Sequence, residues 1–129
     1  MKGEDFMKIY TSYYANLKNI PEDIIPISIA GKCPDFYEGL QYKKLAPKYW
    51  FFQQWKINHD NDFYIENFNK EVLNTLTPKK VVEDLMFLSE GKDVVLLCYE
   101  KLGDFCHRHL VANWLNDNGI DCEEFIKGD

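Results

Sequence analysis

The chain has 129 residues, with 15 Lys and Arg against 21 Asp and Glu, for a formal net charge of −6. That length fits one domain, and 46% hydrophobic with 28% charged residues is typical of a folded globular protein rather than a disordered chain. The negative charge excludes a generally basic protein that coats nucleic acid, although it is compatible with a local basic site.

The termini and the cysteines indicate a compartment. The sequence contains no run of 18 apolar residues, so we expect no membrane span. The polar, acidic N-terminus lacks the apolar stretch of a signal peptide. We therefore predict a cytoplasmic protein whose four cysteines are thiols rather than disulfides. They are Cys33, Cys98, Cys106 and Cys122.

The first half of the chain predicts two strands and one short helix. Residues 7–11 alternate and are rich in strand formers, and residues 12–21 then form a polar loop. Residues 24–30 are a compact apolar run typical of a buried strand, which Pro26 makes irregular or places near an edge. Residues 48–56 follow a proline that suits a first helical turn, and they predict a short helix.

The second half predicts three helices and two strands. Apolar residues recur at helical spacing over 63–76 and again over 77–91, where a threonine and a proline begin the second helix. Residues 93–98 are a continuous apolar run, the pattern of a strand covered on both faces. A helix is predicted from Asp104, as its cap, to about Asn118, and a final strand over 120–126.

This order of elements defines the predicted fold class. It favours a single small α/β domain over residues 7–129, with a short, mostly parallel, Rossmann-like sheet and helices on both faces. Residues 1–6 are expected to be a disordered extension of that domain.

The carboxyl ends of three predicted strands carry polar and reactive side chains. Ligands of open α/β sheets bind outside these ends, near a topological switch point. Because parallel strands bring their carboxyl ends to one edge, we expect the three ends to meet there. The predicted ligand-binding residues are Ser12, Tyr13, Lys32, Cys33, Cys98, Glu100, Cys106, His107 and Arg108.

The third of these ends suggests an anion site. Backbone N–H groups and a positive helix dipole at a helix start, together with the guanidinium of Arg108, suit a phosphate. The same position would lower the pKa of the Cys106 thiol. Glu100 could act as a general base or hydrogen-bond a base edge or ribose. Alternatively, Cys106 and His107 simply pack beneath the helix.

Other thiol chemistries fit this segment less well or remain open. Cys98 and Arg108 follow the order of phosphatase and sulfur-transfer loops, but nine intervening residues are too many to wrap one phosphate tightly. Zinc on the two cysteines, with Cys33 and His107, matches no ligand spacing. Adjacent ligands such as Cys106 and His107 should also point in different directions on a helix, so we assign no metal. A redox pair of Cys98 and Cys106 stays open, as does a structural role.

Residues 32–56 form a locally basic and aromatic segment. They hold five lysines against two acids, a balance of +3, and eight aromatic residues. Lysines interleaved with aromatic rings suit stacking on bases and neutralisation of phosphates. The alternative is that the rings are core and the lysines are the solvated side of the same helix.

The segments 96–100 (Leu-Leu-Cys-Tyr-Glu) and 106–108 (Cys-His-Arg) resemble the signature of the domain of unknown function 488 (DUF488) family. The strand end at Thr11-Ser12-Tyr13, the Leu45-Ala46-Pro47 turn and residues 64–73 are also similar to that family. The resemblance implies a compact α/β domain of bacterial or phage origin, with a pocket around the Leu-Cys-x-Glu and Cys-His-Arg residues. It implies no particular reaction. Ser12-Tyr13-Tyr14 departs from the smaller turn of many members, which bears on the shape of the pocket floor.

Three functions are compatible with these patterns. The leading hypothesis is a binding domain for a small phosphate-bearing or nucleotide-like ligand, held by Arg108, the helix N-terminus and Lys32, with an aromatic ring on the base. The second is an enzyme acting on nucleotides or nucleic-acid bases, with Glu100 as acid or base and a cysteine thiol taking part. The third is a phage or host accessory protein that binds a protein partner through its aromatic residues. No catalytic residue or cofactor is assigned.

Overall fold

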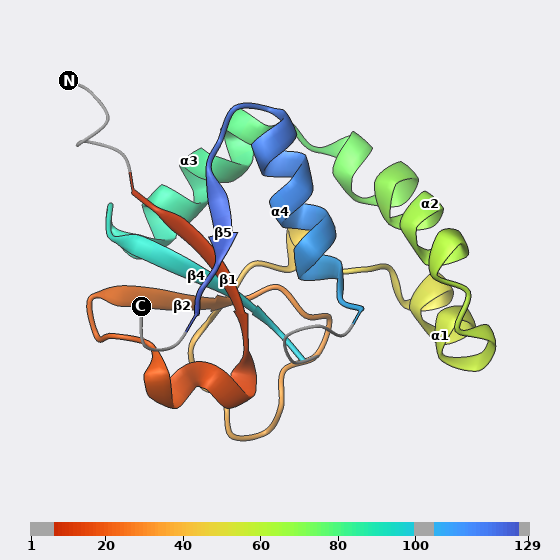
Figure 1. Cartoon of the computed structure of the whole chain (residues 1–129), viewed down its shortest axis with the longest axis horizontal. Coiled ribbons are helices and arrows are strands. Elements are labelled where there is room, and N and C mark those ends of the chain that lie inside the picture. The colour runs from red at the N-terminus through yellow and green to blue at the C-terminus, as the bar shows by residue number, and fades with distance from the viewer. Residues whose placement is uncertain (1–6, 100–104, 127–129) are drawn as a thin grey trace.

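Figure 1 shows the computed structural model, which describes residues 7–99 and 105–126. Within these residues, five parallel strands form one sheet in the order β3-β2-β4-β1-β5. The strands are β1 (Ile9–Tyr13), β2 (Ile24–Ser28), β3 (Leu40–Gln41), β4 (Asp93–Cys98) and β5 (Cys122–Glu124). The predicted small α/β domain is confirmed, and its sheet is wholly parallel. The expectations for residues 1–6, Glu100 and Asp104 lie outside the described residues.

The central strand is β4, whose six residues Asp-Val-Val-Leu-Leu-Cys are buried beyond the first. It pairs with β1 in a register that places Tyr13 opposite Cys98, and with β2 so that Ser28 lies opposite Leu97. The carboxyl ends of these three strands therefore meet at one edge. From β1 the chain passes to β2 on one side of β4, and from β4 it passes to β5 on the other side. The topological switch point thus lies between β1 and β4, where ligands of such sheets bind.

The helices divide unequally between the two faces of the sheet (Figure 1). The α-helices are α1 (Tyr49–Asn58), α2 (Asn61–Glu71), α3 (Pro78–Ser89) and α4 (His107–Asp117). Their buried side chains pack with Val94 and Leu96 on one face of β4. The opposite face, with Val95 and Leu97, is covered by the 3-10 helix η2 (Tyr14–Asn19) and by loop residues. Alternation along one buried strand separates the two cores, since successive side chains point to opposite faces.

Several elements differ from the sequence prediction for local reasons. The helix expected over 63–76 ends at Glu71 and is followed by the separate 3-10 helix η4 (Leu73–Thr75), because Val72 takes φ −119° and ψ −70° and interrupts the spiral. The short strand β3 pairs only at its two residues, which are exposed and carry no apolar pattern. The polar loop expected over 12–21 contains η2.

The start of α4 matters most for the site. The sequence predicted a helix from residue 104, but α4 begins at His107 with Cys106 in the N-cap position. Cys106 is extended, at φ −156° and ψ 146°, so its side chain does not follow helical spacing. None of the helices in the described part of the chain is long and apolar enough to cross a membrane, and a cytoplasmic location stays a prediction.

Candidate functional site

The carboxyl edge of the sheet brings together residues from β1, β4, α4 and β5. Cys98 ends β4, and the first residues of α4 lie against it with Cys106 as their cap. Cys98, Cys106, His107 and Arg108 are all buried, and the Arg108 side chain has no exposed surface. The predicted convergence of residues 98 and 106–108 is therefore observed, at the switch point.

Cys98 and Cys106 are joined as a disulfide across eight residues of sequence. This corrects the expectation that all four cysteines are thiols, while Cys33 and Cys122 are free. The sequence spacing alone does not reveal this pairing. The Cα atoms lie 7.2 Å apart, slightly beyond the ~4.4–6.8 Å usual for disulfides, so the same backbone also suits two thiols that face each other.

His107 is held in one orientation beside the cysteines. Its Nε2 atom lies 2.7 Å from the carbonyl oxygen of Ile29, which can only accept, so Nε2 carries the proton and donates. The other ring nitrogen, Nδ1, lies 3.9 Å from Cys106 Sγ. Burial, with a smaller contribution from the charge of Arg108, lowers the pKa of His107 from 6.5 to about 4. At neutral pH the ring is therefore neutral, with the Nδ1 lone pair directed toward the sulfur.

Arg108 is engaged by side chains rather than presented to solvent. Its Nε and Nη2 atoms donate to the two carboxylate oxygens of Glu124 at 3.1 and 3.0 Å, a bidentate ion pair. Nη1 donates to Cys98 Sγ at 3.2 Å, and the guanidinium carbon lies 5.6 Å from the centre of the Tyr13 ring. Thr11 donates its hydroxyl proton to Glu124 at 2.7 Å. The Arg108 donors that the sequence assigned to a ligand anion are therefore already bonded to a carboxylate of the chain.

The sulfur of Cys98 lies in a positive environment as a result. A guanidinium N–H that donates to sulfur stabilises the thiolate over the thiol, because the charged form accepts the stronger hydrogen bond. Cys98 rather than Cys106 receives this bond. The sequence assigned thiolate stabilisation to Cys106 at the helix start, whereas the guanidinium contact is made by the cysteine at the strand end.

Three potential ligand atoms converge in this cluster. The sulfurs of Cys98 and Cys106 and a ring nitrogen of His107 all lie within 4.8 Å of one another. The argument that adjacent residues 106 and 107 must point apart is wrong, because Cys106 is extended before the helix and is outside its spiral.

The other end of this edge is aromatic and lies on the opposite face of the sheet. The hydroxyl groups of Tyr14 and Ser28 hydrogen-bond to each other, and the Cys33 thiol donates to Ser28 Oγ at 3.2 Å. Tyr99 directly follows Cys98, lies with its ring centre 5.0 Å from that of Tyr14 and donates its hydroxyl proton to the Lys32 carbonyl at 2.6 Å. Its side chain is 49% exposed. This end offers the face of an aromatic ring next to the cysteine cluster.

The remaining predicted site residues make different contacts. Ser12 is buried, and its hydroxyl accepts a hydrogen bond from Asn16 at 3.0 Å, so it supports η2. Tyr13 covers the Arg108 guanidinium, and Lys32 is exposed near Tyr99. Glu100 lies outside the described residues, and its predicted acid–base role stays a prediction.

The aromatic segment 32–56 is divided between the core and the surface. Phe51 is fully buried in the main core, and Phe52 and Trp55 pack against that core. Tyr49 and Trp50 are 75% and 51% exposed on α1. Part of the segment is therefore core, and part is a surface aromatic patch beside exposed lysines.

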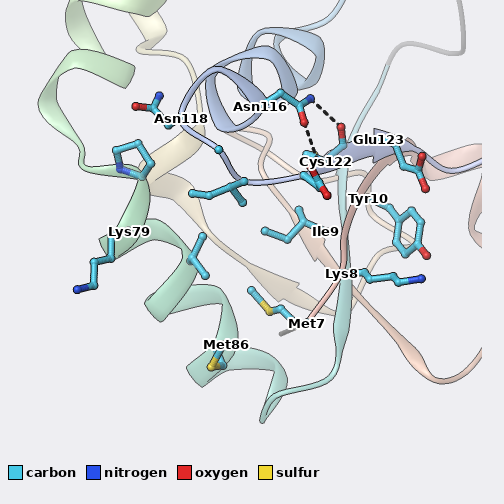
Figure 2. Close-up of a pocket in the computed structure, with 15 residues that line it drawn as sticks. Met7, Lys8, Ile9, Tyr10, Lys79, Met86, Asn116, Asn118, Cys122 and Glu123 are labelled. Carbon is cyan, nitrogen blue, oxygen red and sulfur yellow. Dashed lines mark hydrogen bonds between the residues drawn. The ribbon is translucent and has the colours of Figure 1, made fainter. Parts of the chain in front are cut away.

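A separate groove of about 1060 Å³ opens at the other end of the sheet (Figure 2). It lies between α3, the last turn of α4 and strands β1 and β5, and Met7, Ile9 and Met86 line its apolar part. Asn116 closes one side by bonding the backbone of Cys122 with both atoms of its amide. Despite its size, we do not assign this groove as the functional site. Its free thiol, Cys122, is buried, and burial raises the pKa of that thiol to about 12, so it stays protonated at neutral pH. The cysteine cluster instead lies at the topological switch point of the sheet.

Sequence reasoning missed Glu124, Tyr14 and Ser28. Glu124 could have been found from the sequence, because it lies in the final predicted strand and ligands of such sheets bind at the carboxyl ends of the strands. Tyr14 stood at the first of these strand ends but was not included among the ligand-binding residues, and Ser28 carried no signal, because its role depends on a contact between β2 and η2.

Comparison with known proteins gives one result. A family model described as "Active DUF488-N3 subclade" matches residues 15–119, most of the chain and all of the cysteine cluster. No curated protein and no solved structure matches the chain.

Proposed function

The chain belongs to the DUF488 family, and from that premise we propose that it is an enzyme acting on a small phosphate-bearing or nucleotide-like ligand. The ligand binds at the carboxyl edge of the sheet, and the thiols of Cys98 and Cys106 take part in the reaction. The observation that carries this proposal is the 3.2 Å contact from Arg108 Nη1 to Cys98 Sγ at the end of the central strand.

The energetics of Arg108 favour a functional role for this cluster. A buried ion pair is weak evidence for stability, because well-packed apolar residues of similar volume are often as stabilising or more so. Here a fully buried guanidinium touches a carboxylate, a sulfur and a ring at once. Such a costly arrangement beside two cysteines suits a reactive centre, and the word "Active" in the family description supports catalysis over a purely structural role.

The exposed aromatic surface supports the class of ligand. Tyr99 follows Cys98 directly, and its half-exposed ring can stack on a nucleobase placed beside the thiols. Arg108 is bonded to Glu124, and the exposed Lys32 offers a cation to a phosphate at this edge. Binding is thus assigned to Tyr99 and Lys32, and chemistry to the thiol cluster.

Thermal unfolding of the reduced full-length chain with nucleoside phosphates, free nucleobases and inorganic phosphate tests the binding step. Ligand at 100 times its Kd stabilises by about 2.7 kcal/mol, which corresponds to a rise in Tm of roughly 6–12 °C for a chain of this size. Tyr99→Ala should abolish the rise, whereas Tyr49→Ala, at an exposed tyrosine of α1, should leave it unchanged. If no compound shifts the Tm at millimolar concentration, the proposal is wrong.

Turnover separates an enzyme from a binding domain. Mass spectrometry of each stabilising ligand after incubation should show a new product with the wild type and none with Cys98→Ser. Cys122→Ser, which removes a buried cysteine away from the edge, is the matched control and should retain turnover. Ligand that stabilises both variants and is never converted would favour the binding domain instead.

A protein-binding role is the second candidate, favoured by the exposed Tyr49 and Trp50 on α1. This hypothesis predicts that Trp50→Ala abolishes formation of a complex while the variant keeps the wild-type unfolding midpoint. If every nucleotide response remains in Trp50→Ala, the aromatic patch and the carboxyl edge serve separate purposes.

A further inference from the structure

We infer that the reduced protein binds a zinc ion through Cys98 Sγ, Cys106 Sγ and His107 Nδ1. The inference deepens the proposed function, on whose site it rests, by stating how the two thiols take part. Neither the family match nor the sequence pattern assigns a metal to this chain.

The spacing of the three atoms suits a tetrahedral ion. Zn–S and Zn–N bonds of about 2.3 and 2.0–2.1 Å place a sulfur and a nitrogen ligand roughly 3.6 Å apart, and two sulfurs roughly 3.8 Å apart. Cys106 Sγ and His107 Nδ1 are 3.9 Å apart, and all three ligand atoms lie within 4.8 Å of one another. The spacing of the Cys106 sulfur and the His107 nitrogen already fits, and the two sulfurs must separate on reduction to surround one ion.

The imidazole is fixed in the form that a metal requires. Because Nε2 donates to the Ile29 carbonyl at 2.7 Å, Nδ1 has no proton and directs its lone pair toward the sulfurs. A metal-bound histidine almost always donates its other ring N–H to a backbone carbonyl, a carboxylate or water, which fixes the ring orientation. The His107–Ile29 bond is that outer contact.

The backbone of the cysteine pair suits separated sulfurs. Cα atoms 7.2 Å apart exceed the usual span of a disulfide, and they allow the two sulfurs to move apart to the distance that an ion requires. The disulfide and metal forms exclude each other. A phosphine and one water convert the disulfide to two thiols and a phosphine oxide, and zinc then displaces one proton from each thiol.

The local charges balance around a divalent ion. Two thiolates neutralise the ion, and the carboxylate of Glu124 neutralises Arg108. Arg108 Nη1 then serves as a hydrogen-bond donor to a ligand sulfur, as outer contacts of metal sites commonly do. Two thiolates and one imidazole favour a borderline-soft ion such as zinc over magnesium or calcium, which prefer oxygen ligands.

Within the part of the chain that the structure describes, three side chains could ligate this ion. Structural zinc sites are closed by four protein ligands, whereas catalytic sites use three and leave the fourth position to water or substrate. A site made by these three residues at the switch point would polarise a phosphate or carbonyl oxygen of the ligand, or lower the pKa of a bound water.

Cobalt(II) is the probe for this site, because thiolate ligands to cobalt give a strong charge-transfer absorption band. The full-length chain is reduced by a phosphine, titrated to four free thiols, and then mixed with cobalt(II) without air. We expect one cobalt per chain, displaced by zinc(II). Cys98→Ser, Cys106→Ser and His107→Gln should each weaken binding by more than the 10–100-fold typical of losing an outer contact. Cys33→Ser and Cys122→Ser should bind as the wild type does.

Alkylation of the wild-type protein tests the same inference without depending on the folding of a variant. Zinc should abolish the reaction of Cys98 and Cys106 with iodoacetamide, read by peptide mass spectrometry, and leave that of Cys33 unchanged. Fully reduced protein that gives neither the cobalt band nor this protection overturns the inference, as does an equal loss of binding in Cys33→Ser.

The two proposals can fail separately in one experiment, the nucleotide thermal shift repeated with zinc and with a chelator. A cobalt band without any nucleotide response would remove the proposed function and leave the metal site. Nucleotide stabilisation in protein that binds no metal would remove the metal site and leave the proposed function.

Discussion

The buried ion pair between Arg108 and Glu124 has unequal partners, and this inequality predicts unequal costs of substitution. The Arg108 side chain has no exposed surface, whereas that of Glu124 is 16% exposed. Glu124→Gln removes the carboxylate that pairs with a fully buried guanidinium, while Arg108→Met leaves a carboxylate that water reaches and to which Thr11 still donates. Removal of the carboxylate should therefore be the more damaging change.

The magnitudes follow from the contacts. Removal of one partner of a buried pair costs about 3–5 kcal/mol when the charge left behind stays buried, so we expect about 3 kcal/mol for Glu124→Gln. Arg108→Met loses its charged hydrogen bonds but retains apolar packing, and about 1–2 kcal/mol is expected. The double variant should cost little more than Arg108→Met, so in a double-mutant cycle its loss should fall short of the sum of the two single losses by about 2–3 kcal/mol.

Urea unfolding followed by tryptophan fluorescence measures these differences. With a slope of about 2 kcal/mol/M for a domain of this size, Glu124→Gln should lower the midpoint by roughly 1.5 M. Glu123→Gln, at the exposed neighbour in β5, is the control and should stay within about 0.5 kcal/mol of the wild type. If Arg108→Met costs as much as Glu124→Gln, or more, the argument from unequal burial is refuted.

Three further predictions concern pH and packing. Because the pKa of His107 falls from 6.5 in the unfolded chain to about 4 on folding, the stability of metal-free protein should drop as pH falls through that range. The drop, about 2–3 kcal/mol, should vanish in urea titrations of His107→Gln but not of His59→Asn. Tyr42→Phe removes the hydroxyl that donates to Asp84 and holds the pKa of its carboxyl group below 3.8. NMR titration should therefore find a higher pKa for Asp84 in the variant, and an unchanged pKa would contradict this role of Tyr42. Phe51→Ala should cost about 3–5 kcal/mol in urea, since the ring is fully buried; a loss below 1 kcal/mol would contradict its place in the core.

The fold was largely predictable because its signals are local and strong. A continuous apolar run such as residues 93–98 can be buried on both faces only in the middle of a sheet, and β4 is the central strand. The amphipathic spacing of α2 and α3 likewise indicated which sides pack. The two-residue strand β3 escaped notice because its pairing depends on the neighbouring β2 rather than on any pattern of its own.

The convergence of the candidate site residues was predictable, but their contacts were not. The rule that ligands bind at the carboxyl ends of parallel strands located Tyr13, Cys98 and Arg108 before any coordinates were known. It could not reveal that Arg108 is paired, because the partner lies 16 residues away in an edge strand whose register against β1 sets the carboxylate position. The convergence of Cys106 with His107 was likewise hidden, since it depends on one extended residue at the helix start.

The order of amino acids was sufficient to indicate an α/β domain, the family, and the edge of the sheet where the cysteine, histidine and arginine side chains meet. These conclusions depend on periodicity, strand composition and short motifs, all of which are properties of neighbouring residues. The disulfide, the orientation of the histidine and the occupied guanidinium required the folded chain. Each depends on distances between segments far apart in sequence, and those distances are set by packing and strand register, which no local pattern encodes.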